Sequence, residues 1–393
     1  MNGYGSERTS SYVGKAKDMS NTTPRVSIVL ANFNGGDWLQ KSISSVLAQK
    51  YQNWELILID DCSTDHSREI IESFQDNRIY PFYLPNNQHM VYGFNFGISQ
   101  ARGEYIARID SDDFWHSEKL ALQVEFLDCH PEYGACFTWV DVVDENDNQI
   151  TEFYTDRVEI FKVKNMGQAK WLHYMYFRGA CLCHPSVLMR KTVLDDVGWY
   201  NYALVQIQDY ELWLRIVKKY PIYVIQTPLV NYRWFMNGEN ASAPSPTTNI
   251  RSNYEFTYVL SKFFDDIPDD LFIKAFQSEF IHKDRMDKLH LECEKMFLQL
   301  RAVFCGHAPK LGGMERFAHL LEAEETREIL KKDYGVNQKN FYELSASPLF
   351  YDPSSNIDSI PLRTLIRKVI IRILDKTPAL KRFLKGCMRL IGK

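Results

Sequence analysis

From Arg25 onward, short apolar runs rich in β-branched residues alternate with amphipathic stretches of helical periodicity. This alternation is typical of strands that helices join into a parallel sheet. We therefore expect an α/β fold with a mostly parallel sheet flanked by helices. The predicted strands cover residues 26–31, 54–60, 79–84, 105–109 and 133–142, and the predicted helices lie near residues 38–49, 67–74, 91–101 and 117–129. The last helix is expected to begin at Ser117 with an acidic first turn.

The chain of 393 residues is longer than one average domain, so the organisation beyond the sheet also needs an interpretation. A helix near residues 210–219, a strand near 222–226 and a loop at 236–248 extend the main region. Residues 250–345 show the periodicity of helices. The predicted parts are a disordered leader at 1–23, a main domain at 24–245, a helical extension at 250–345, a linker at 346–360 and a basic amphipathic tail at 361–393.

Charge is distributed unevenly between the tail and the rest of the chain. Residues 361–393 contain ten Lys or Arg and one Asp, a net charge of +9, so the remainder carries −13 of the total of −4. An acidic body argues against a nucleic-acid binder, whose phosphate contacts need basic surface across the fold. The tail has two apolar stripes at helical spacing with basic residues beside them, which is typical of helices that lie on an anionic membrane surface. Packing on the acidic body or on a second subunit is the alternative.

Cysteine usage and hydropathy indicate the compartment. Eight cysteines lack paired CxxC spacing, so reduced thiols and a cytoplasmic location are expected. Cys181, Cys183 and His184 are close in sequence, but a fourth ligand at zinc-site spacing is missing. No signal sequence or run of about 18 apolar residues is evident, which predicts a chain without a membrane-spanning helix.

Polar residues follow three predicted strands, at the sheet edge where open α/β folds bind ligands. The first strand runs into Asn-Phe-Asn-Gly-Gly at 32–36, the second into Asp-Asp-Cys-Ser-Thr-Asp at 60–65, and the fourth into Asp-Ser-Asp-Asp at 110–113. Three carboxylates within four residues repel one another unless a cation joins them. Mg²⁺ or Mn²⁺, with oxygen ligands shared between carboxylates and substrate phosphates, is the natural partner. An acidic turn that caps the following structure is the equally weighted alternative.

Two other nucleotide-binding folds lack their motifs in this chain. No GxxxxGK[ST] phosphate loop occurs, and the turn after the first strand is not GxGxxG. A P-loop NTPase and a dinucleotide-binding Rossmann domain are therefore not supported. A diphosphate bound at this edge would need a metal to neutralise it.

The order of these segments resembles that of family-two glycosyltransferases, which have the GT-A fold. The resemblance covers residues 25–235, and its donor-side motifs are VSIVLANFNG at 26–35, SISSVLAQ at 42–49, WELILIDDCSTD at 54–65 and GEYIARIDSDD at 103–113. Its acceptor-side motifs are HPSVLMR at 184–190, GWY at 198–200 and QDYELWLR at 208–215.

The resemblance implies a role for each matching position. Ala31 and Phe33 would contact the nucleotide base, and Asp61 would hydrogen-bond the uracil of a UDP-sugar. Asp110 would contact the ribose or the metal, and Asp112 would bind the metal that bridges the diphosphate. In the later motif, Asp209 matches the general base of the family, which takes the proton of the acceptor hydroxyl. An N-cap of the following helix is the structural alternative for this residue.

Two positions depart from the pattern of the family. Gln208 stands where a Glu often precedes the aspartate, so the second carboxylate is missing there. Phe235 stands where a His often follows the Tyr-Arg-x segment, which puts a complete protein ligand set for the metal in doubt.

His184 and Trp213 are candidate acceptor contacts. For both residues, a buried packing role is at least as well supported by the sequence context.

The resemblance, together with the basic tail, implies a metal-dependent inverting glycosyltransferase that moves a sugar from a UDP-sugar to a glycan, expected to be lipid-linked, in the assembly of a bacterial surface polysaccharide. The expected location is cytoplasmic, on the inner face of the membrane, where residues 361–393 would bind, and a second copy of the chain is a further candidate partner. One rival is a nucleotidyltransferase that makes sugar nucleotides, which would need a Gly-rich basic loop after the first strand. The other rival is a non-catalytic sugar-nucleotide-binding scaffold.

Overall fold

A computed structural model describes residues 23–150, 159–235, 245–302 and 308–346. The chain forms two compact units, residues 1–329 and residues 330–393. The predicted leader at 1–23, apart from its last residue, lies outside the described residues, as do the predicted tail and all but the first residue of the linker at 346–360. The division between a main domain at 24–245 and an extension at 250–345 stays a prediction.

The first unit is built on one eight-stranded sheet with the order β3-β2-β1-β4-β7-β6-β8-β5. Strands β1, β2, β3 and β4 are parallel, β7 is antiparallel to both β4 and β6, and β8 is parallel to β6 and antiparallel to β5. The carboxyl ends of β1, β2, β4, β6 and β8 therefore share one edge. The strands are β1 Val26–Asn32, β2 Trp54–Asp60, β3 Ile79–Tyr83, β4 Tyr105–Asp110, β5 Phe114–Trp115, β6 Ala135–Val143, β7 Leu188–Arg190 and β8 Ile222–Arg233.

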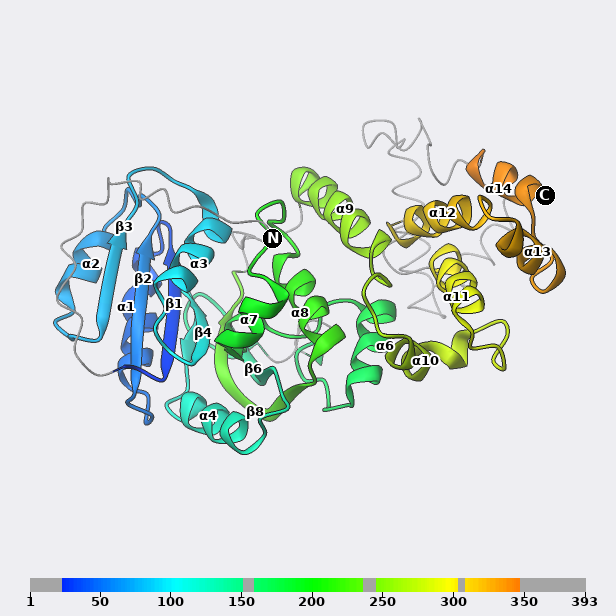
Figure 1. The fold of residues 1–393 in the computed structure, drawn as a ribbon. Coiled ribbons are helices and arrows are strands. Elements are labelled where there is room, and N and C mark those ends of the chain that lie inside the picture. The colour runs from blue at the N-terminus through cyan, green and yellow to red at the C-terminus, as the bar shows by residue number, and fades with distance from the viewer. Residues whose placement is uncertain (1–22, 151–158, 236–244, 303–307, 347–393) are drawn as a thin grey trace, which may run out of the picture. The chain divides into compact units, whose positions relative to one another are not determined.

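Helices cover both faces of this sheet (Figure 1). Alternate residues of a strand point to opposite faces, so Ile28 and Leu30 pack with α1, α2 and α4, whereas Val29 packs with α3, α6 and α8. The mostly parallel α/β fold expected from the sequence is confirmed. The helices of the sheet region are α1 Gly36–Leu47, α2 Ser67–Ser73, α3 His89–Gln100, α4 Lys119–Cys129, α6 Gln168–Arg178, α7 Lys191–Val197 and α8 Gln208–Lys219.

Several element boundaries differ from the sequence expectation. Helix α4 begins at Lys119, because the Lys119 amide donates to the carbonyl of His116 in a preceding turn, and no side chain caps the helix. The expected cap at Ser117 is therefore wrong. Strand β8 continues to Arg233, seven residues beyond the expected end at Gln226, because its second half pairs with both β5 and β6. This extension brings Arg233 to the same edge as the ends of β1 and β4.

The helical region that follows is confirmed, with α9 Pro246–Ser261, α10 Asp269–Phe276, α11 Lys288–Arg301, α12 Ala308–Leu320, α13 Glu324–Lys332 and α14 Gln338–Ser345. Helix α9 begins inside the expected loop at 236–248, because Ser245 forms a capping box with Thr248 and Pro246 occupies the first turn. Leu260 and Phe264 belong to the same core cluster as Trp171. The start of the helical region thus packs on the helices that cover the sheet.

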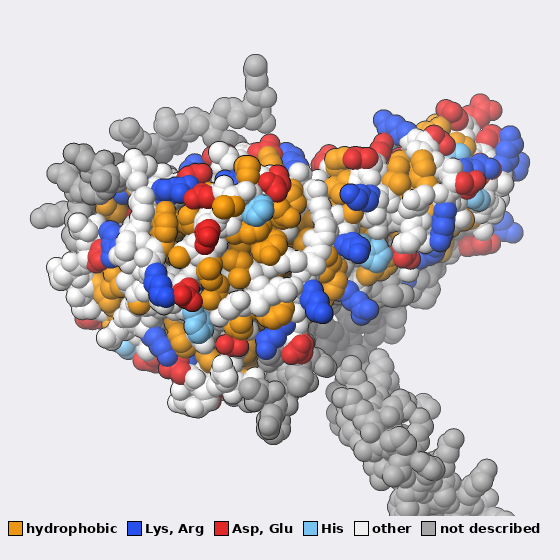
Figure 2. Space-filling view, turned by 90° about the horizontal axis from the view of Figure 1, so that it is seen from below, with side chains coloured by type: hydrophobic (Ala, Val, Ile, Leu, Met, Phe, Trp, Pro, Cys, Tyr) orange, Lys and Arg blue, Asp and Glu red, His pale blue; other side chains and the backbone are white. Residues whose placement is uncertain are grey.

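Side chains of both charge signs are interspersed among the described residues on the face shown in Figure 2. Apolar side chains lie between them. Within the described ranges, no helix is both long and apolar enough to span a bilayer.

Candidate active site

The turns after β1 and β2 are joined to each other by side-chain hydrogen bonds. Asn34 has a positive φ of 53°, and its carbonyl Oδ1 accepts from the Thr64 amide at 2.8 Å. Ser63 Oγ accepts from the Asn34 amide at 3.0 Å, and Asp65 Oδ2 accepts from the Gly36 amide at 2.9 Å. These hydrogen bonds therefore join the two turns into one edge of the site.

The turn after β4 lies against the turn after β1. A Cβ on Gly35 would come within 2.5 Å of Asn32 Oδ1 and 2.7 Å of Ser111 Oγ, so only glycine allows this approach. Ser42 Oγ on α1 donates to the carbonyl of Asp110 at 2.9 Å. These contacts bring the acidic turn beside the predicted nucleotide-binding residues.

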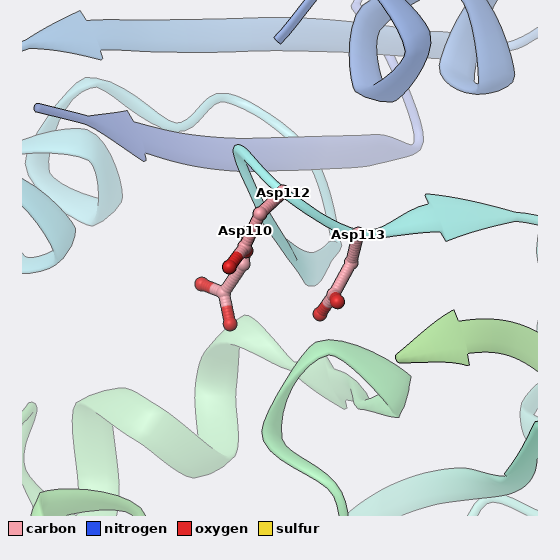
Figure 3. Close-up of side chains that lie close together, drawn as sticks. All are labelled: Asp110, Asp112 and Asp113. Carbon is pink, nitrogen blue, oxygen red and sulfur yellow. The ribbon is translucent and has the colours of Figure 1, made fainter. Parts of the chain in front are cut away.

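Asp110, Asp112 and Asp113 project from the turn between β4 and β5 to the same side (Figure 3). Each offers a carboxylate oxygen, and these three atoms lie within 4.8 Å of one another. Asp110 and Asp112 are partly exposed, whereas Asp113 is buried. Asp113 Oδ1 accepts from the Arg233 amide at 2.7 Å, and its buried Oδ2 has no hydrogen-bond partner within the part of the chain that the structure describes.

Burial and mutual repulsion make these carboxylates difficult to ionise together. Burial, with a further contribution from the charge of Asp110, raises the pKa of Asp112 to about 7. Burial also raises the pKa values of Asp110 and Asp113. A cation among the three would reverse this effect, and carboxylate oxygens are the ligands that Mg²⁺ and Mn²⁺ prefer. The donor set therefore fits a hard divalent cation, with Asp110 and Asp112 as the accessible ligands.

Arg108 supplies one positive charge beneath this cluster. Its guanidinium Nη2 lies 2.5 Å from Asp110 Oδ1, and the group stacks over the ring of Phe94 at 4.1 Å. Arg108 is 4% exposed, so this ion pair is shielded on the arginine side. Arg108 was not predicted as a site residue, because the sequence of an apolar strand does not indicate which way a single basic side chain points.

Arg233 holds the acidic turn from the other side. Its amide binds Asp113, its Nε donates to the Asp112 carbonyl at 2.8 Å, and its Nη2 donates to Asp147 Oδ1 at 2.7 Å. Nη1 donates to the Asp144 carbonyl at 2.6 Å. With 1% of its surface exposed, Arg233 acts on the turn and is not itself presented to a substrate phosphate.

Asp209 is the second residue of α8, and Ile207 occupies the N-cap position. The N-cap alternative for Asp209 is therefore wrong. Asp209 Oδ1 accepts from the Tyr210 amide at 2.7 Å, which fixes the carboxylate. Burial raises the pKa of Asp209, and the charge of Asp110 raises it further, while the Arg108 guanidinium lowers it. The candidate base thus lies close enough to the acidic turn to interact with it electrostatically.

The two candidate acceptor contacts are buried. His184 is 8% exposed, and its Nε2 lies 2.6 Å from the Tyr200 hydroxyl. Burial holds the pKa of His184 well below its usual range, and Arg108 lowers it further. Trp213 is 1% exposed and packs edge-on against His184 and Phe137. This burial favours the packing interpretation for both residues, and their acceptor role stays a prediction.

The candidate nucleotide contacts lie at the ends of β1 and β2. Ala31 pairs in register with Asp110, and Phe33 is 51% exposed just beyond the strand. Asp61 is 3% exposed and its Oδ1 accepts from the Gln88 amide at 2.7 Å. Burial raises the pKa of Asp61. Asp61 therefore also anchors the segment that leads into α3.

A GT-A sheet with an acidic turn at its carboxyl edge, and a carboxylate from a later helix nearby, defines the class as a glycosyltransferase. The family model described as Glycosyl transferase family 2 matches residues 27–198. A relative that is 31% identical and is covered over 80% of its length shows that this chain belongs to glycosyltransferase family 2. The UDP-Glc:alpha-D-GlcNAc-diphosphoundecaprenol beta-1,3-glucosyltransferase WfaP of Escherichia coli is 31% identical over 222 residues, which are 56% of this chain and 80% of WfaP.

Of two further matches, one is shorter and the other rests on the fold alone. An uncharacterized glycosyltransferase of Haemophilus influenzae is 44% identical over 106 residues, 26% of this chain and 42% of that protein, so the chain spans less than half of this relative. The structure of S. aureus TarS 1–349 in complex with UDP-GlcNAc matches with a TM-score of 0.52 and 15% identity, over 75% of this chain and 89% of TarS 1–349. This likeness supports the GT-A fold.

Proposed function

We propose that this glycosyltransferase is an inverting, divalent-metal-dependent enzyme that transfers a sugar from a UDP-sugar to a glycan acceptor. The observation that carries the proposal is the acidic turn at the carboxyl edge of the sheet, where Asp110, Asp112 and Asp113 each offer a carboxylate oxygen within 4.8 Å of the others. The charge of Asp110 also acts on Asp209. A base and a diphosphate-binding turn have to lie on either side of one sugar ring for transfer to occur. A nucleotidyltransferase or a non-catalytic scaffold does not need a base beside that turn.

In this mechanism Asp209 removes the proton of the acceptor hydroxyl as its oxygen attacks the anomeric carbon. The bond from that carbon to the diphosphate oxygen breaks, the electron pair leaves with UDP, and a single displacement inverts the configuration. A positioned base typically contributes ~10²–10⁴-fold to such a step. The burial that raises the pKa of Asp209 makes it a stronger base than an exposed carboxylate.

Asp110 and Asp112 would hold the cation, which when bound stabilises the charge that develops on the leaving diphosphate. Asp61, Ala31 and Phe33 would hold the nucleotide base at the adjoining edge. The name of WfaP gives UDP-Glc as its donor and a diphosphoundecaprenol-linked sugar as its acceptor, which supports a UDP-sugar donor and a lipid-linked acceptor for this chain.

A screen of nucleotide-sugars tests the proposal. The full chain is incubated with UDP-glucose, UDP-GlcNAc and GDP-mannose, with Mn²⁺, Mg²⁺ or EDTA, and release of the nucleoside diphosphate is measured. We expect release from a UDP-sugar that requires metal. Release of pyrophosphate from UTP and a sugar phosphate would instead indicate a nucleotidyltransferase, and donor binding without any turnover would indicate a scaffold.

The basic tail at 361–393 would hold the enzyme on the cytoplasmic face of the membrane, where a lipid-linked acceptor is found. The support is its composition, because each Lys or Arg near an anionic leaflet is worth ~1 kcal/mol. Deletion of 361–393 should abolish sedimentation with anionic liposomes and leave metal-dependent UDP-sugar hydrolysis intact. If the truncated protein instead unfolds or loses a homodimer, the tail has a structural role.

A further inference from the structure

The segment between α7 and α8, residues 198–207, leads directly into the candidate base and contains no helix or strand. Three buried or half-buried side chains from other elements hold its backbone. Arg215 donates to three successive carbonyls, those of residues 197–199, at 2.5–2.8 Å. Asn95 bonds both the amide and the carbonyl of Tyr200, at 3.1 and 2.8 Å.

The third of these side chains is Glu255, on α9. Its Oε1 accepts from the Val205 amide at 3.0 Å, and its Oε2 accepts from the amides of Gln206 and Ile207 at 2.8 and 3.1 Å. Glu255 is 1% exposed. A buried carboxylate is costly unless it is well hydrogen-bonded, and these three amides meet that requirement.

These amides immediately precede α8. Ile207 is the N-cap of the helix and Asp209 is its second residue, so Glu255 fixes the backbone two residues before the base. Its negative charge also lies at the positive end of the helix dipole of α8, which is favourable. A shift of residues 205–207 would move the start of α8 and the Asp209 carboxylate with it.

Helix α9 is itself held firmly by α11 and α12. Gln299 on α11 donates to the carbonyls of Leu260 and Ser261 at 3.2 and 2.8 Å. A Cβ on Gly312 of α12 would come within 2.1 Å of the Ser261 carbonyl oxygen, so the two helices touch backbone to backbone. The support for residues 205–207 is thus anchored in the helical region that follows the sheet.

We infer that Glu255 is a positioning residue for the base, through which helix α9 sets the place of Asp209. The inference rests on the proposed function of Asp209. Glu255 lies beyond residues 27–198, the part of the chain that the family model matches. The helical region that begins with α9 would therefore contribute to catalysis as well as to folding.

The test compares Glu255→Ala and the isosteric Glu255→Gln with a matched control. Glu294 on α11 is 0% exposed and accepts from the amides of Ile281 and His282 at 2.8 and 2.9 Å, so Glu294→Ala removes the same kind of contact away from Asp209. For each variant kcat, the Kd for UDP in Mn²⁺, and amide hydrogen exchange at residues 205–207 are measured.

Glu255→Ala should accelerate exchange at 205–207 and lower kcat by roughly 10- to 100-fold, the cost of misplacing a catalytic group by about 1 Å. Its Kd for UDP should stay within about twofold of wild type, because Glu255 does not contact the donor side. Glu255→Gln keeps one acceptor oxygen and should fall between wild type and Glu255→Ala; it also provides the measurement if the alanine variant does not fold.

An unchanged kcat in both Glu255 variants, or an equal loss of kcat in Glu294→Ala, would overturn the inference. These outcomes can be told apart from failure of the proposed function. If the proposed function is wrong, the wild-type protein itself transfers no sugar from any donor. In that case exchange at 205–207 still decides whether Glu255 holds this segment, and the role toward a base is refuted.

Discussion

The guanidinium of Arg108 lies 2.5 Å from the carboxylate of Asp110, on the same strand and two residues before it. Nε and Nη1 of Arg108 are buried and have no hydrogen-bond partner among the described residues. Arg108 therefore forms its close ion pair with Asp110, while its charge also acts on Asp209 and His184. A cation bound to Asp110 would share this carboxylate with Arg108.

This sharing predicts the effect of Arg108→Met, which keeps an apolar stem and removes the charge. The variant should lose about 3 kcal/mol of stability without metal, since it leaves Asp110 beside two other carboxylates without compensation. Mn²⁺ should raise the melting temperature of the variant more than that of wild type. Arg102→Met, which breaks the pair of Arg102 with buried Glu55, is the control and should show no such metal effect. Equal Mn²⁺ shifts in all three proteins would show that Arg108 and the cation do not share Asp110.

Asp112→Asn should weaken UDP binding in the presence of Mn²⁺ and change it little in EDTA, because Asp112 is expected to act through the cation. Calorimetric titration under both conditions measures this difference. The substitution keeps the shape of the side chain and so preserves the turn that Arg233 holds through the Asp112 carbonyl. If affinity falls equally with and without metal, Asp112 has a structural role.

Asp61→Asn should weaken UDP binding whether or not metal is present and relax the preference for uracil over other bases. Asn can still accept from the Gln88 amide through its carbonyl oxygen, so the segment leading into α3 should stay in place. Competition between UDP and GDP, measured by calorimetry, checks the change. An unaltered affinity for UDP would remove Asp61 from the nucleotide site.

The burial of Lys119 predicts that the stability of the protein depends on pH. It is 0% exposed, its ammonium lies 3.9 Å from the ring centroid of Trp115, and Nζ has no hydrogen-bond partner within the described ranges. Burial lowers the pKa of Lys119 from 10.5 to about 7. Between these values the unfolded chain holds a proton that the folded chain has released, so the free energy of unfolding rises with pH.

Lys119→Met should therefore be more stable than wild type at pH 7, and its advantage should shrink toward pH 10. Denaturant unfolding at both pH values provides the measurement. Lys50→Met, at an exposed ion pair with Glu118, is the control and should show no comparable change. A methionine variant that is less stable than wild type at pH 7 would show that Lys119 is charged and stabilised by Trp115.

Sequence patterns predicted the parts of this protein that local residues determine. The strands and helices of residues 26–129 are close to their expected positions, because each buried strand such as Trp54–Asp60 is a continuous apolar run between turn residues. The expectation that polar residues at strand ends would meet is confirmed for Ser111 of the acidic turn and Gly35 of the turn after β1. Because the carboxyl ends of parallel strands lie at the same edge of a sheet, this outcome follows from the topology.

The sequence could not indicate contacts between distant elements. Asp113 was counted in the acidic turn but was given no role of its own, since its burial depends on pairing with Arg233, 120 residues away. Glu255 looked like any charged residue of a helix, because only the packing of α9 buries it against residues 205–207. The short strands β5 and β7 carried too few residues for a pattern of period two to appear.

The central claim is that Asp209 is the base for sugar transfer, and Asp209→Asn tests it most directly. Asn keeps the oxygen that accepts from the Tyr210 amide, so the start of α8 should be preserved. Steady-state transfer from the preferred nucleotide-sugar and calorimetric titration with UDP are measured on the same preparation. We expect kcat to fall by about 10²–10⁴-fold while the Kd for UDP stays close to that of wild type. Retention of more than about a tenth of the wild-type rate would contradict the assignment.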